Sequence, residues 1–221
     1  MYTHFRDLYR IGTYILVILF NVDRMVFSVK KVRKSLRTLI VFAIFIVVII
    51  YLLDGVGKRM FPLEYRDLVI KYSQENELDP LFVFSVIKAE SNFDPQATSH
   101  KNARGLMQII DNTGIWAADR MGIEEFRVEY LYDPEINIKI GCWYLKSLRN
   151  EIYKYNGQIN NDLVLAAYNG GIGNVQKWLK DKEYSSTGKT LDKIPYKETE
   201  NYVRKVNNYQ KIYKRLYEKD I

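Results

Sequence analysis

Cysteine and histidine are nearly absent from this chain of 221 residues, which contains one cysteine, Cys142, and two histidines, His4 and His100. A single cysteine excludes an intrachain disulfide, and its apolar helical surroundings indicate a small core residue. So few nitrogen and sulfur ligands argue against a zinc site, and no motif indicates an organic cofactor. Histidine-dependent nucleophilic catalysis after the first 50 residues would require His100, which lies in a polar stretch and is a weak candidate.

Residues 58–221 also lack an internal repeat and any convincing alternation of apolar and polar residues typical of β-strands. Their apolar residues recur at helical spacing instead, and Asp79–Pro80 and Asp133–Pro134 each combine an N-cap with a first-turn proline. The predicted fold class is therefore all-α, one domain of about 160 residues. The expected helices cover roughly 64–76, 79–91, 112–121, 133–153, 161–168, 174–180 and 196–218, with a further short one beginning in 105–110.

One long run, residues 39–53, has no charge, glycine or proline. Extended over 36–56 it reaches about 20 residues, the length at which a helix spans the hydrocarbon core of a bilayer. A buried core helix is disfavoured because such a helix normally has a polar face. A cleaved signal peptide is disfavoured because the run is too long and no small-residue cleavage site follows. Residues 39–57 are therefore predicted to be a transmembrane signal anchor.

Nearly all of the net charge of +7 resides in residues 1–38, which contain eight basic and two acidic side chains. The remainder is almost neutral, so the charge is no sign of nucleic-acid binding. A basic segment before a membrane helix stays in the cytoplasm, which predicts a single-pass protein with residues 58–221 outside. A second apolar run, 11–20, is too short to span. Because the sequence from Met25 alone has the form of a basic segment plus anchor, we hypothesise that residues 1–24 are not translated.

An acidic residue ends the most apolar predicted helix of the domain. Glu90 follows Val83, Val86 and Ile87 at spacings that place all four on one helical face. A carboxylic acid at the end of an apolar stripe is desolvated, its pKa rises, and near neutral pH it can act as a general acid. On position alone, a glutamate that simply turns to water at a helix end is the commoner case.

Three further motifs have both a structural and a functional interpretation. In GLMQI (105–109), Gly105 permits an unusual turn and Gln108 offers a donor and an acceptor, although Leu106 and Met107 suit a core. AAYNGGIGN (166–174) suits a helix C-terminus and lacks the lysine of a phosphate-binding loop. In ETENYV (198–203), Glu198 and Tyr202 share a helix face, which an exposed acid and a packed tyrosine would also explain.

Together, the order and spacing of these motifs resemble the lytic transglycosylase family of the soluble murein transglycosylase type, over roughly residues 63–215. The resemblance implies a lysozyme-like α fold with a groove for peptidoglycan glycan strands. It implies that Glu90 is the catalytic acid, and that the substrate-binding positions are Ser99, Gln108, Tyr168, Asn169, Glu198 and Tyr202. The family often has Met-Pro after the GLMQ-I/L motif; this chain has Ile110-Asp111 and keeps Thr113.

The resemblance further implies cleavage of the bond between N-acetylmuramic acid and N-acetylglucosamine without hydrolysis, which leaves 1,6-anhydromuramyl ends. Glu90 would be acid and then base, with Tyr168 preferred over Tyr202 as its direct partner. Two alternatives stay open: a hydrolytic muramidase of the goose-type lysozyme kind, and a catalytically silent glycan-binding scaffold. Most of the tryptophans are expected in the core, and the sequence singles out none as a sugar platform. It indicates no protein partner.

Overall fold

The computed structural model describes residues 33–34 and 36–221. It comprises two units, Met1–Gly57 and Lys58–Ile221. The apolar run 11–20, the hypothesised start at Met25 and most of the basic segment lie outside the described residues. They remain predictions from the sequence.

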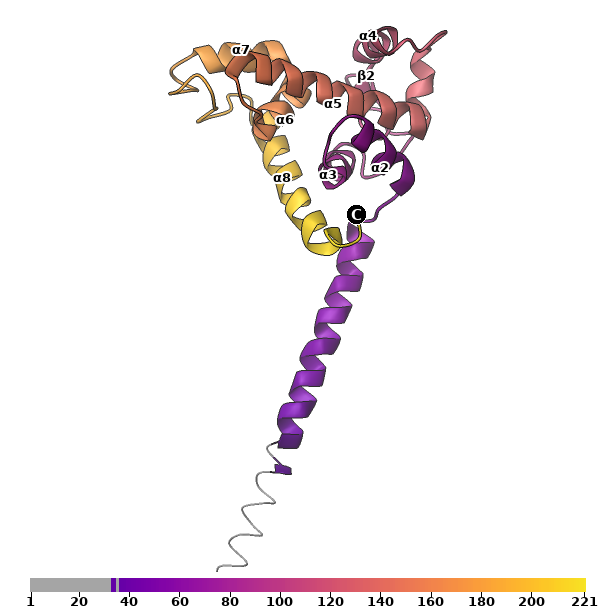
Figure 1. The fold of residues 1–221 in the computed structure, drawn as a ribbon, viewed down its shortest axis with the longest axis vertical. Helices are drawn as coiled ribbons and strands as arrows, with labels where there is room; N and C mark the ends of the chain where they lie inside the picture. The colour runs from indigo at the N-terminus through magenta and orange to yellow at the C-terminus, as the bar shows by residue number, and fades with distance from the viewer. Residues whose placement is uncertain (1–32, 35) are drawn as a thin grey trace, which may run out of the picture. The chain divides into compact units, whose positions relative to one another are not determined.

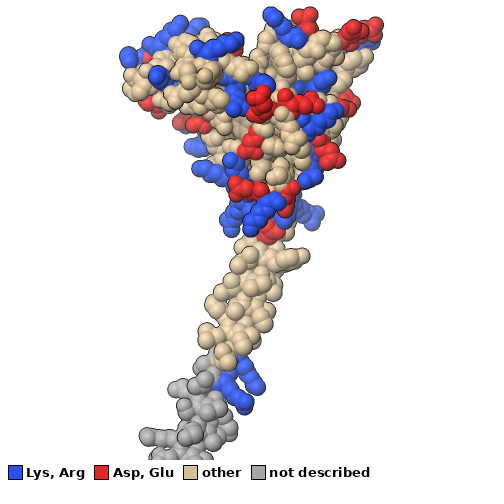
Figure 2. All heavy atoms as spheres, in the orientation of Figure 1, with Lys and Arg blue, Asp and Glu red and all other residues tan. Residues whose placement is uncertain are grey.

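A single long helix, Leu36–Met60, covers the predicted membrane anchor. It has 25 residues, and an 18-residue stretch within it has a mean hydropathy of 2.9, so it is long and apolar enough to cross a membrane. The apolar side chains along it, from Leu39 to Leu53, are all exposed, and Figure 2 shows an uncharged stretch along this helix. Exposed apolar groups over this length are unfavourable in water, so the helix suits a lipid environment.

The second unit is almost entirely helical (Figure 1). Acidic and basic side chains are interspersed over its visible face, in keeping with its near-neutral charge (Figure 2). Its elements in chain order are α2 (Arg66–Glu75), α3 (Pro80–Glu90), β1 (Ala103–Arg104), β2 (Ile109–Ile110), α4 (Asp111–Met121), the 3-10 helix η1 (Val128–Tyr132), α5 (Pro134–Asn156), α6 (Asn161–Gly170), α7 (Ile172–Lys180) and α8 (Lys197–Tyr217).

Helix α3 is the centre of the core. Every side chain from Leu81 to Ile87 is buried, because α8 and α2 pack against it and α5 packs against α2. A helix that is apolar all round is stable only when neighbours enclose it in this way. Apart from Pro80 at its start, α3 reaches the surface only at its C-terminal turn, Lys88–Glu90.

The two Asp-Pro signals mark helix starts as predicted. Asp79 accepts a hydrogen bond from the backbone N–H of Leu81 at 2.9 Å, and Asp133 accepts one from Ile136 at 2.9 Å. These caps fix where α3 and α5 begin. Since α3 is only three turns long, its N-cap also determines where its last residue, Glu90, is placed.

The short helix expected to begin in residues 105–110 does not form. Gly105 and Gln108 have positive φ angles of 72° and 49°, which an α-helix does not accommodate. The segment instead makes a tight turn and enters β2, which pairs antiparallel with β1. A Cβ on Gly105 would lie 2.1 Å from the carbonyl oxygen of Leu131, so only glycine fits there.

Candidate active site

Glu90 is the last residue of α3 and remains partly exposed at the end of the most deeply buried helix. Burial raises the pKa of Glu90 to about 7. Desolvation is the largest cause, because an ionised carboxylate loses more hydration free energy on burial than a neutral carboxylic acid does. Near neutral pH the side chain therefore populates both protonation states, as a group that must give and then recover a proton requires.

Three groups of α8 modify this pKa. The Tyr202 hydroxyl and the Lys205 ammonium lower the pKa of Glu90, whereas the negative charge of Glu198 raises it. The Tyr202 hydroxyl is buried and has no partner in full hydrogen-bond geometry, although it lies near enough to Glu90 to favour the carboxylate. A phenol left without another partner is free to donate to this carboxylate as charge develops on it.

Lys205 was not anticipated from the sequence. Its ammonium donates to the carbonyl oxygen of Ala89 at 2.7 Å and so joins α8 to the C-terminal turn of α3. A cation is favourable there because it also complements the negative end of the helix dipole. The available signal was its position three residues after Tyr202, which places both side chains on one face of α8.

Tyr168 is not the direct partner of Glu90 that the sequence interpretation preferred. Its hydroxyl donates to the carbonyl oxygen of Met107 at 2.7 Å, which commits its single proton to the GLMQ turn. Tyr168 still lies close to the acid, since the charge of Glu90 helps burial to raise the pKa of the Tyr168 phenol. The tyrosine adjacent to the carboxyl and free to donate to it is Tyr202.

The GLMQ turn is held by side chains from three helices. Ser91, directly after Glu90, donates to the carbonyl oxygen of Leu106 at 2.8 Å, and Tyr168 binds Met107 from α6. From α5, the buried Asn137 accepts a bond from the N–H of Met107 at 2.7 Å and donates to the carbonyl oxygens of two other residues, Arg104 at 2.9 Å and Leu131 at 2.7 Å. The turn is thereby fixed relative to the helix that carries the acid.

Asn137 is a second residue that motif reasoning missed. All of its side-chain polar atoms are used, as a buried amide requires. The signal was an asparagine between Ile136 and Ile138 in a helix with an apolar core face. Such a residue either faces water or binds backbone that has left regular secondary structure.

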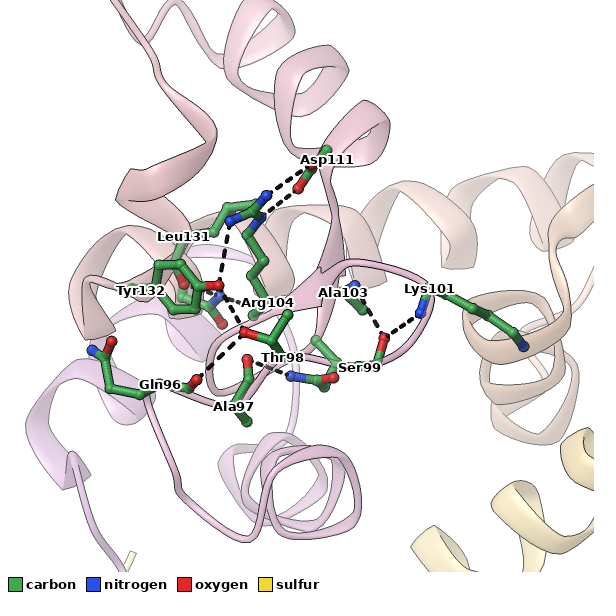
Figure 3. Close-up of polar contacts among 12 residues, drawn as sticks. Gln96, Ala97, Thr98, Ser99, Lys101, Ala103, Arg104, Asp111, Leu131 and Tyr132 are labelled. Carbon is green, nitrogen blue, oxygen red and sulfur yellow. Dashed lines mark hydrogen bonds and ion pairs between the residues drawn. The ribbon is translucent and has the colours of Figure 1, made fainter.

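Gln108 and Ser99 lie in the loop that leads into and out of this turn. The amide nitrogen of Gln108 donates to the carbonyl oxygens of Ala97 at 3.1 Å and Gly105 at 3.0 Å. The Ser99 hydroxyl oxygen accepts from the N–H groups of Lys101 at 3.2 Å and Ala103 at 3.1 Å (Figure 3). These contacts use the Gln108 amide nitrogen and the Ser99 hydroxyl oxygen, and they involve neither the Gln108 carbonyl oxygen nor the Ser99 hydroxyl hydrogen.

The same loop is braced against α4. Arg104 binds Asp111 through two parallel contacts of 2.7 and 3.1 Å, and it also donates to the Tyr132 hydroxyl at 3.3 Å (Figure 3). The Tyr132 hydroxyl in turn shares a 2.7 Å hydrogen bond with Thr98. A bidentate arginine–carboxylate pair of this kind fixes orientation as well as distance. It therefore holds in place the strand pair that presents Gln108.

Asn169 and Glu198 both line an open pocket of about 460 Å³. Asn169 accepts a hydrogen bond from Thr199 at 2.8 Å, which joins the end of α6 to the start of α8. Glu198 is exposed and pairs with Lys101 at 3.4 Å, from the loop of Ser99. Tyr196 and Lys197 complete the polar and aromatic lining. The site thus has one buried acid and one solvated, paired acid.

The two remaining residues considered in the sequence analysis, Cys142 and His100, have no contact with Glu90 among those described above. Cys142 is fully buried and free, and burial raises the pKa of its thiol, so it is a core residue as predicted. His100 is exposed in the turn that follows Ser99. Among residues 33–34 and 36–221 no cluster of His, Cys, Asp and Glu could hold a metal ion.

Comparison with known proteins identifies the family. The model described as "Transglycosylase SLT domain" matches residues 67–190. The chain is 34% identical over 164 residues to the soluble lytic murein transglycosylase of Escherichia coli K12, covering 71% of this chain and 24% of that protein. It is 33% identical over 178 residues to the membrane-bound lytic murein transglycosylase C of Sodalis glossinidius, covering 69% and 47%.

Solved structures agree. The 70-kDa soluble lytic transglycosylase of Escherichia coli superposes with a TM-score of 0.63 at 30% identity, covering 72% of this chain and 25% of that one. An inactive mutant of the lytic transglycosylase Slt from Pseudomonas aeruginosa gives 0.60 at 29% identity, covering 70% and 24%. This chain spans a quarter to a half of the length of these relatives. The predicted all-α, lysozyme-like fold is confirmed, and the chain belongs to the transglycosylase SLT domain family.

Proposed function

We propose that this protein is a membrane-anchored lytic transglycosylase that cleaves the β-1,4 bond between N-acetylmuramic acid and N-acetylglucosamine in peptidoglycan. The observation that carries the proposal is Glu90, a single carboxyl group with a pKa raised to about 7 by burial and flanked by Tyr202. Membership of the family, and relatives named as soluble and membrane-bound murein transglycosylases, support the substrate class.

In the first step, the protonated Glu90 carboxyl gives its proton to the glycosidic oxygen as the bond from that oxygen to the anomeric carbon breaks. The N-acetylglucosamine departs with a free 4-hydroxyl. The acetamido oxygen of the muramyl sugar stabilises the oxocarbenium-like centre, which substitutes for a second protein carboxylate. Glu90 is now ionised, and the Tyr202 hydroxyl and the Lys205 cation favour that state.

In the second step, the Glu90 carboxylate takes the proton of the muramyl 6-hydroxyl, whose oxygen bonds to the anomeric carbon. The product carries a 1,6-anhydro ring, no water is consumed, and Glu90 is again protonated. Because one group serves as acid and then base, its pKa has to lie near the working pH. The value of about 7 meets that requirement.

The ends of the strands produced discriminate between this reaction and hydrolysis. Purified sacculi are digested with the wild-type protein, and the muropeptides are analysed by mass spectrometry. Anhydro ends, lighter by one water than reducing ends, are expected, and they should be missing with Glu90→Gln. Reducing ends would instead show a muramidase in which Glu198, whose charge acts on Glu90, activates water. Binding of sacculi without any product would indicate a scaffold.

The helix Leu36–Met60 is the proposed anchor, with the basic residues before it in the cytoplasm and the catalytic unit outside. Murein lies outside the cytoplasmic membrane, so this orientation places the enzyme beside its substrate. Protease added to intact spheroplasts should digest the part that follows Met60. Protection of that part, with digestion only after lysis, would reverse the proposed orientation.

A further inference from the structure

An unbroken row of aromatic rings leads away from the active site. Tyr168 of α6 contacts Tyr144 of α5 with ring centroids 5.4 Å apart. Tyr144 contacts Trp116 of α4 at 6.2 Å, and Trp116 contacts Trp143 of α5 at 5.1 Å. The row joins three helices, and it begins at the tyrosine that holds the GLMQ turn.

These rings are not fully buried, although Tyr168, Tyr144 and Trp143 also pack against the core. Phe84 and Tyr213, which pack within the core, have no exposed surface. The four rings of the row all retain exposure, and the Trp116 side chain is 41% exposed. Beside Trp116 on the same segment, Ile115 and Ile110 are also exposed, at 52% and 45%. A solvent-exposed aromatic and aliphatic patch that continues an active site is typical of ligand binding.

The arrangement of the helices indicates what the row does. Helix α5 runs between α4 toward one end and α6 and α7 toward the other (Figure 1). The outline of the molecule is notched between the parts that carry α4 and α7 (Figure 2). Because its first three rings come from α6, α5 and α4 in turn, the row extends from the Glu90 side of the unit toward α4. The fourth ring, Trp143, packs against Trp116 from α5.

We propose that Trp116, Trp143 and Tyr144 form a sugar-binding platform for the glycan strand, at rings several positions from the bond that Glu90 cleaves. Aromatic faces bury the C–H faces of pyranose rings, and the hydroxyl and N-acetyl groups stay hydrated. The inference rests on the proposed function for its ligand, since continuity with the catalytic site favours the strand over a protein partner.

The test compares glycan fragments of two lengths. Peptide-free glycan strands are fractionated into a tetrasaccharide and a pool of about ten sugars, and their binding to full-length Glu90→Gln protein in detergent is measured by calorimetry. Adding Trp116→Ala to that protein should weaken the binding of the long fragments about tenfold, because it removes an aromatic face on which a sugar ring would pack. The tetrasaccharide, which fills only the positions around the scissile bond, should bind unchanged.

Two matched variants isolate the role of the ring. Trp116→Tyr keeps an aromatic face and should recover most of the affinity for long strands. Tyr153→Ala removes another exposed aromatic of α5, 55% exposed and outside the row, and should leave both affinities unchanged. The melting temperature of each variant is measured, so that a loss of fold is separated from a loss of binding.

Equal weakening for both lengths would overturn the platform, because it would show that Trp116 only supports the fold. Unchanged binding of the long strands would overturn it as well. The binding measurement does not depend on turnover. If wild-type protein released no anhydro ends while the length-dependent effect persisted, the proposed reaction would fail and the platform would stand.

Discussion

Two glutamates, at the ends of two helices, border the same site and have opposite environments. Glu90 ends α3, the most deeply buried helix, and desolvation raises its pKa to about 7. Glu198 lies in the first turn of α8, is exposed, and pairs with Lys101. The comparison shows that burial, and not residue type, separates the two carboxyl groups and raises the pKa of one of them toward neutrality. The charge of Glu198 adds to this shift, because it too raises the pKa of Glu90.

The largest expected difference between the two acids is in turnover. Glu90→Gln should lower the rate on purified sacculi by about 10³-fold, within the range for loss of a general acid–base. Glu198→Gln, the matched control, should lower it by about tenfold or less. Release of soluble fragments from labelled sacculi measures both. Comparable losses for the two variants would mean that the reaction needs two carboxylates.

The Glu90→Gln substitution, which should lower turnover, should raise the stability of the folded chain. The pKa of Glu90 is higher in the folded than in the unfolded chain, so the folded form binds more protons between about pH 4.3 and pH 7. Stability therefore falls as pH rises through this window, and the cost is complete above pH 7. The free energy of unfolding of Glu90→Gln should exceed that of the wild type by about 2 kcal/mol at pH 8 and equal it at pH 4. Urea denaturation at the two values is the measurement, and a difference independent of pH would rule out this origin.

The next largest difference is expected between Tyr202 and Tyr168, whose substitutions should affect the pH dependence of activity differently. Tyr202→Phe removes the donor that favours the Glu90 carboxylate, so the pKa of Glu90 rises and the rate falls about tenfold. The decline of activity at alkaline pH should move to higher pH. Tyr168→Phe breaks the bond to Met107 and should reduce stability without moving that decline. A shifted decline in Tyr168→Phe alone would restore Tyr168 as the direct partner.

The smallest expected effect belongs to Lys205. Lys205→Met removes a positive charge that lowers the pKa of Glu90, so the alkaline decline should move to higher pH. The ratio of the rates at pH 8 and pH 6 should rise about twofold, the equivalent of ~0.5 kcal/mol from a partly exposed charge. Lys205→Arg keeps the charge and should keep the ratio. An unchanged ratio in Lys205→Met would show that the charge of Lys205 does not affect the pKa of Glu90, and that its role is limited to the contact with Ala89.

The contrast between these groups also shows how far the sequence could be interpreted. Helix starts at Asp79 and Asp133 followed from local capping chemistry, and the apolar stripe ending at Glu90 followed from helical spacing. The residues 105–110 were misassigned because their positive φ angles are stabilised by Asn137, some 30 positions away. No local pattern reports such a contact.

For the same reason, the sequence could not assign the separate roles of Tyr168 and Tyr202. Tyr202 lies on α8, which packs against α3, and Tyr168 lies on α6, which packs against α8. Either spacing permitted a contact with Glu90. Which hydroxyl is free depends on the carbonyl of Met107, which faces Tyr168 only once the turn has formed. Motif spacing thus identified the residues that gather at the site, and tertiary packing decided what each one binds.

The most direct test of the central claim is the titration of Glu90 itself. Full-length protein with carboxyl-¹³C glutamate is titrated by NMR in detergent, and the Glu90 resonance is assigned by its absence from Glu90→Gln. The account predicts one glutamate that titrates near pH 7, well above the rest. A Glu90 resonance that titrates near pH 4.5, together with the other glutamates, would contradict it.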